Sequence, residues 1–169
     1  MSKAVMLSIR PKWCEKIASG EKTIEVRKTR PKLDTPFKCY IYCTQSGVEL
    51  VAWGKHGKVI GEFTCDRIDR LAPANESYGI YDIDDDYVLQ TCLENGELWD
   101  YGHGTSLYGW HISDLKIYDK PRELREFKKS NRDCFYADLG LAKRDCPDCK
   151  DPGCFLERPP QSWCYVEDG

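Results

Sequence analysis

The sequence predicts an α+β fold built as a small β-barrel with flanking short helices. Five or six short segments alternate apolar and polar side chains, as strands do when one face is buried. Two or three short stretches between them carry helical spacing and helix-end residues. A chain of 169 residues is also long enough to bury a sizeable core in one main domain.

The composition excludes two classes of protein. Mean hydropathy is -0.60, and no apolar run approaches the roughly 20 residues that span a bilayer. Hydrophobic residues make up 41% of the chain and aromatic residues 12%, which is too many for a largely disordered protein. We therefore expect a soluble, cytoplasmic protein that has no contact with membranes.

The first third of the chain predicts three strands and one helix. Apolar and polar residues alternate over 4–9, again over 23–27, and a third strand is predicted at 38–43. Pro11 suits the first turn of a helix, and Gly20 suits the position just after its end.

The middle of the chain predicts two more strands and a second helix. The strands lie at 48–53 and 58–68, and Gly61 indicates a bulge in the latter. The acidic run 82–86 favours the positive end of a helix that continues to Asn95–Gly96.

The last part of the chain predicts a strand at 108–118 and a short helix from Pro121 through Phe127. These elements place a barrel domain at 1–130 and a Cys-rich tail, packed on the barrel, at 131–169.

Charge is distributed unevenly, although the formal net charge is only -3. Residues 1–38 carry ten basic side chains against four acidic ones, whereas residues 61–100 carry eleven acidic against two basic. A basic third can guide a polyanion such as RNA to one face of a protein. The alternative is that the two sets of charges merely solvate opposite sides of the fold.

Ten cysteines in a cytoplasmic chain require an explanation other than disulfides, because cytosolic thiols are kept reduced. Five of them crowd the tail, where a pair is separated by two residues and turn sequences follow. Four thiolates at such turns predict a closed, structural zinc site. The predicted ligands are Cys146, Cys149, Cys154 and Cys164. One alternative is a tail of free thiols. A further alternative is that the tail docks a protein partner and the barrel serves as its platform.

The densest polar signal lies between Gly20 and Arg27. Lys22 enters a strand on which Glu25 and Arg27 project from one face. The cations could hold a phosphate, and Glu25 could accept a hydrogen bond from a base or a sugar hydroxyl. The alternative is that Glu25 and Arg27 pair with each other on a solvated strand face.

The pattern formed by Gly20, Lys22, Glu25 and Arg27 resembles the GxKxxExR signature of the ASCH domain family, which belongs to the PUA-like superfamily. The resemblance runs from residue 4 to residue 127. It includes two flanking segments, Ser8–Trp13 and Gly109–Ile112. It implies a β-barrel with flanking helices and a cleft that binds nucleic acid or a nucleotide.

The ligand-binding residues that we predict combine this signature with neighbouring cations and with rings on which unpaired bases could stack. They are Arg10, Lys12, Trp13, Lys22, Thr23, Glu25, Arg27, Tyr108 and His111.

Whether the protein is an enzyme stays open at the level of sequence. One family branch hydrolyses acetylated cytidine with a threonine nucleophile three residues after the lysine, and this chain has Glu25 there. A hydrolase would therefore have to use Lys22 with Glu25 as the base. A ribonuclease would draw its acid and base from His103 and His111. Either histidine could equally be a structural residue.

Overall fold

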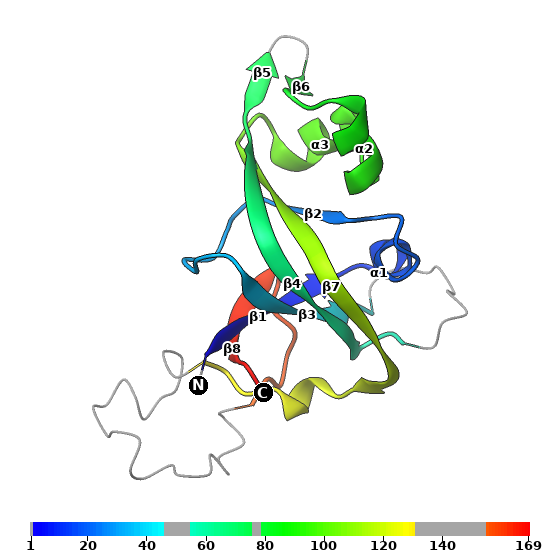
Figure 1. Cartoon of the computed structure of the whole chain (residues 1–169), viewed down its shortest axis with the longest axis vertical. Coiled ribbons are helices and arrows are strands. Elements are labelled where there is room, and N and C mark those ends of the chain that lie inside the picture. The colour runs from blue at the N-terminus through cyan, green and yellow to red at the C-terminus, as the bar shows by residue number, and fades with distance from the viewer. Residues whose placement is uncertain (1, 46–54, 76–78, 131–154) are drawn as a thin grey trace. The chain divides into compact units, whose positions relative to one another are not determined.

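The computed structural model describes residues 2–45, 55–75, 79–130 and 155–169 (Figure 1). Six described strands form one mixed sheet, and two short strands form a second sheet. The strands of the large sheet, in spatial order, are β2 (Ile24–Arg27), β7 (Leu107–Arg122), β4 (Lys58–Leu71), β3 (Phe37–Cys43), β1 (Lys3–Ile9) and β8 (Trp163–Glu167). The small sheet pairs β5 (Pro73–Asn75) with β6 (Ile80–Tyr81).

Three α-helices and one 3-10 turn complete the described elements. They are α1 (Pro11–Ala18), α2 (Asp85–Thr91), α3 (Asn95–Gly102) and the 3-10 turn η1 (Leu124–Glu126). β1 runs parallel to β3 and antiparallel to β8, while β2 runs antiparallel to β7. The predicted α+β class is thus confirmed. The described pairings run in a linear order from β2 to β8, so closure of a barrel stays a prediction.

The chain divides into two compact units. The first contains Met1–Cys14, Lys38–Phe63 and Lys116–Gly169, and the second contains Glu15–Phe37 and Thr64–Leu115. The long strands β4 and β7 contribute residues to both units.

Each unit has its own hydrophobic core. In the first unit β1 and β3 supply apolar residues, and Val166 of β8 packs with them at 0% exposure. In the second unit α3 supplies Leu98, which is also fully buried and lies against Val26 of β2. Burial of these side chains is the main favourable term that holds β2 and β8 in place.

Most predicted elements are found, with three corrections. The helix predicted to run from 82–86 to Asn95–Gly96 is two helices, because Cys92 ends α2 in the left-handed conformation and a capping box at Glu94 begins α3. Pro73–Asn75 and Ile80–Tyr81, for which the sequence predicts no strand, form β5 and β6. Pro121 lies in β7 rather than in a helix, so only the turn η1 follows it.

Other predictions are untested. The strand predicted at 48–53 lies outside the described residues. The domain boundary predicted at residue 130 also stays a prediction, although β8 from the tail pairs with β1.

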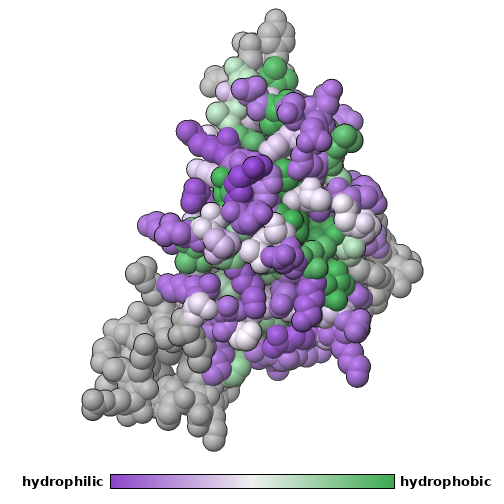
Figure 2. Space-filling model, in the orientation of Figure 1, coloured by the Kyte–Doolittle hydropathy of each residue, from purple (hydrophilic) through white to green (hydrophobic). Residues whose placement is uncertain are grey.

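The surface drawn in Figure 2 is mostly hydrophilic, with hydrophobic residues gathered in small areas. In the described part of the chain, every helix is too short and too polar to cross a bilayer.

Candidate functional site

Strand β2 presents the signature residues on one face of the second unit. In the antiparallel pairing with β7, Glu25 lies opposite Trp110 and Arg27 lies opposite Tyr108. Side chains of paired residues point to the same face of a sheet, and neighbours along a strand point to opposite faces. Tyr108, a predicted ligand residue, therefore shares a face with Glu25 and Arg27.

Lys22, Glu25 and Arg27 form a buried ion-pair cluster. The Glu25 carboxylate lies 2.9 Å from Nη2 of Arg27 and 3.5 Å from Nζ of Lys22. The side chains of Lys22, Glu25 and Arg27 are 1%, 8% and 8% exposed. The structure thus brings together the three residues that the sequence singles out, and it buries a cluster that could have been a solvated strand face.

Lys22 also supports the end of helix α2. Its ammonium donates a hydrogen bond of 2.6 Å to the backbone carbonyl of Thr91, the last residue of the helix. Helix ends leave carbonyl groups without intrahelical partners, and a cation there also interacts favourably with the helix dipole. Neighbouring Thr23 is tied to the same helix, because its backbone N–H donates to the carbonyl of Gln90.

Burial lowers the pKa of the Lys22 ammonium below its ordinary value of 10.5, and the attraction of Glu25 opposes this effect. Between the folded and unfolded pKa values, the unfolded chain therefore binds more protons at this site. The contribution of Lys22 to the free energy of unfolding therefore rises with pH between these two pKa values, of which the unfolded one is the higher.

This shift predicts a pH dependence of stability. We expect the free energy of unfolding of the wild type, minus that of Lys22→Met, to increase as pH rises toward about 10. Urea denaturation at several pH values measures this difference. The same subtraction for Lys120→Met, at an exposed position late in β7, supplies the baseline. A difference that falls as pH rises would contradict the lowered pKa.

Tyr101 is a member of the site that sequence reasoning missed. It lies in α3, and its hydroxyl interacts electrostatically with both Arg27 and Glu25. Burial is the main reason that its pKa is raised. The residue is nevertheless 37% exposed, and Nζ of Lys28 lies 4.9 Å from the centre of its ring. No short-range pattern joins positions so far apart in the chain, so this contact had no signal in the sequence.

His111 lies on the other face of β7. It is opposite Ile24 in the β2 pairing, whereas Glu25 is opposite its neighbour Trp110. Its Nε2 lies 2.6 Å from a carboxylate oxygen of Asp69, and Arg67 lies beside the same carboxylate at 3.2 Å. His111 is therefore engaged with β4 residues instead of joining the signature cluster. His103 ends helix α3 in the left-handed conformation.

The remaining predicted ligand residues lie in the first unit. Arg10 and Lys12 are exposed, and the Lys12 ammonium lies 4.6 Å from the centre of the Trp13 ring. This cation–π contact orients the indole at the start of helix α1.

The predicted zinc site falls mainly outside the described residues. Cys146, Cys149 and Cys154 belong to that part, while Cys164 lies on β8, opposite Met6 of β1. Within the ranges that the structure describes, no group of three His, Cys, Asp or Glu side chains could hold a metal. Zinc binding by the tail stays a prediction.

Comparison with known proteins places the fold. No protein-family model matches the chain, and no curated protein matches it. The structure is similar to the crystal structure of ASCH from Zymomonas mobilis, with a TM-score of 0.59 and 19% identity over 97% of this chain and 87% of that one.

Two point variants of the same bacterial protein match equally well, both with a TM-score of 0.59. One is 19% identical over 98% of this chain and 91% of that one. The other is 18% identical over 97% and 88%. This chain therefore has the fold of the ASCH domain structures.

Proposed function

We propose that this chain is an ASCH domain that binds RNA or a nucleotide through the face of the second unit that carries Lys22, Glu25 and Arg27. The shared fold and the signature in β2 support the family assignment. The ligand class is supported by the chemistry of the cluster itself.

The observation that carries the proposal is the pair of cationic side chains gathered around Glu25 in this cluster. Two cations share one carboxylate, and all three side chains are more than nine-tenths buried. Cationic donors in a poorly solvated site attract an anion more strongly than they would in water. A phosphate group is such an anion, and a planar guanidinium matches its geometry.

The surroundings of the cluster suit the rest of a nucleotide. Tyr101 is exposed beside Arg27 and Glu25, and an aromatic ring there can stack on an unpaired base. Exposed Lys28, beside that ring, adds a cation for a neighbouring phosphate.

The geometry favours binding over hydrolysis. Glu25 lies between two cations, 2.9 Å from Arg27 and 3.5 Å from Lys22, so its carboxylate is engaged within the cluster. Lys22 is engaged with Thr91 and Glu25, so its ammonium is committed to the structure.

A salt series tests the proposal. We expect short single-stranded RNA to bind the wild type, and Arg27→Met to weaken that binding by about tenfold and reduce the salt slope by about one. Lys120→Met, in an exposed part of the first unit, is the matched control and should bind like the wild type. Fluorescence anisotropy with labelled RNA measures both quantities.

A second variant separates binding from folding. Tyr101→Leu removes the exposed ring without touching the ion pairs, so we expect weaker RNA binding and unchanged thermal stability. RNA affinity that neither Arg27→Met nor Tyr101→Leu alters would refute the proposed site.

A further inference from the structure

Arg70 extends the face of the second unit that carries the signature residues. It is exposed near the end of β4, the strand next to β7 in the large sheet. Its Nε and Nη2 atoms both donate to the hydroxyl oxygen of Ser106, at 3.2 Å and 3.0 Å. Ser106 precedes Tyr108 by two residues, so the two side chains point to the same face. That face also carries Arg27, which is paired with Tyr108.

The guanidinium of Arg70 has donors left for a ligand. A guanidinium carries five N–H groups, and the contact with Ser106 uses two of them on one neutral oxygen. Among the residues that the structure describes, Arg70 forms no ion pair. Arg70 is therefore oriented by a hydroxyl without being neutralised.

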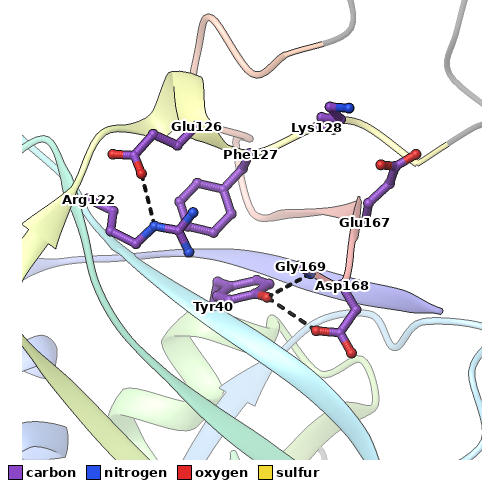
Figure 3. Close-up of a pocket in the computed structure, with 8 residues that line it drawn as sticks. All are labelled: Tyr40, Arg122, Glu126, Phe127, Lys128, Glu167, Asp168 and Gly169. Atoms are coloured by element: carbon purple, nitrogen blue, oxygen red, sulfur yellow. Dashed lines mark hydrogen bonds and ion pairs between the residues drawn. The ribbon is translucent and has the colours of Figure 1, made fainter. Parts of the chain in front are cut away.

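Arg122 of the first unit shows the opposite case. It lines a cavity of about 210 Å³, where it pairs with Glu126 at 3.1 Å and lies 4.4 Å from the centre of the Phe127 ring (Figure 3). Its charge is balanced by a carboxylate and its planar face is covered by a ring. The second unit thus offers the arginine that is better suited to an anionic ligand.

The guanidinium groups of Arg27 and Arg70 are held apart along β7. Arg27 is drawn to the carboxylate of Glu25, which lies opposite Trp110 of β7. Arg70 is drawn to Ser106 instead. Positions 106 and 110 are about 13 Å apart along an extended chain. A separation of this order is too large for one phosphate to bridge, whereas two phosphates of one strand can occupy the two positions.

Tyr108 lies between these two cations. Its side chain is partly exposed, and in the described part of the chain no cation or second ring stacks on it. Proteins that bind single-stranded nucleic acid combine cations for the backbone with aromatic rings on which bases stack. A ring with a guanidinium on either side has both parts.

We propose that Arg70 binds a second phosphate, so that the ligand of this face is a single strand of RNA rather than a free nucleotide. Arg27 would hold one phosphate, Arg70 would hold another, and the base between them would stack on Tyr108. The inference rests on the proposed function, because it extends the same face to a longer ligand.

Two ligands that differ in their number of phosphates test this inference. We expect a single-stranded uridine hexanucleotide to bind the wild type about tenfold more tightly than a uridine dinucleotide, which has one phosphate. Arg70→Met should weaken hexanucleotide binding by about fivefold and reduce its salt slope by about one, without changing dinucleotide binding. Arg70→Lys keeps the charge and should keep the salt slope. Fluorescence anisotropy of the labelled hexanucleotide, with the unlabelled dinucleotide as competitor, measures both affinities.

Controls distinguish this inference from the proposed function. Arg125→Met, at another exposed arginine but in the first unit, should bind both ligands like the wild type. Arg27→Met should weaken the binding of both ligands. An Arg70→Met protein that binds the hexanucleotide like the wild type, or that loses affinity for both ligands equally, would overturn the inference alone. A wild type that binds neither ligand would overturn the inference together with the proposed function.

Discussion

Glu25→Gln should lower the free energy of unfolding by about 3–5 kcal/mol, the usual effect of removing one partner from a buried ion pair. The substitution keeps the size of the side chain and removes its charge. Lys22 and Arg27 would then remain as two cations in a site where water does not reach them. Urea denaturation of both proteins measures the difference.

Glu21→Gln is the matched control for this prediction. Glu21 pairs with Lys16 at 2.8 Å, but its side chain is 60% exposed. Exposed pairs contribute little because water and salt screen them, so we expect no measurable change. Equal effects of the two substitutions would show that Glu25 does not compensate buried charge.

Gly61→Ala should destabilise the first unit by about 2–3 kcal/mol, in the upper range for overpacking. A Cβ at residue 61 would lie 2.5 Å from the backbone carbonyl oxygen of Lys116 and 3.2 Å from Cα of Ile117. Both atoms belong to strand β7, beside β4, and cannot turn aside as a flexible side chain could. The strands would have to separate locally and lengthen their hydrogen bonds.

Gly96→Ala is the control, for which we expect no loss of stability. Gly96 is exposed in helix α3, and an added Cβ would meet nothing within 4 Å. Alanine favours the helix over glycine by up to about 1 kcal/mol, so this variant should be as stable as the wild type or more so. Thermal and urea denaturation measure the change in stability of each variant relative to the wild type. A Gly61→Ala protein as stable as the wild type would contradict the close approach of β4 and β7.

Much of the fold could be predicted from local patterns. Alternation located the strands at 4–9, 23–27 and 38–43 within one residue of each boundary. Gly20 ends the first helix region with a φ of +81°, a conformation that glycine adopts without steric cost. The prediction of one continuous second helix was wrong, because Cys92 adopts the left-handed conformation although it is neither glycine nor asparagine.

The candidate site was predicted only in part. Lys22, Glu25 and Arg27 lie within six residues of one another, and strand geometry alone brings Glu25 and Arg27 to one face. Burial of that face could not be predicted, because it depends on how α2 and α3 pack against β2. The same packing adds Tyr101 to the site, and the register of β2 on β7 turns His111 away from it.

Local sequence patterns indicate the α+β class, most strand positions and the charged trio of Lys22, Glu25 and Arg27, because each depends on residues close together in the chain. The burial of this trio, the contact of Lys22 with Thr91 and the cavity lined by distant segments of the first unit are properties of the folded chain. Burial and long-range contacts are set by strand order and core packing. Both depend on interactions between segments far apart in the chain, which local periodicity does not encode.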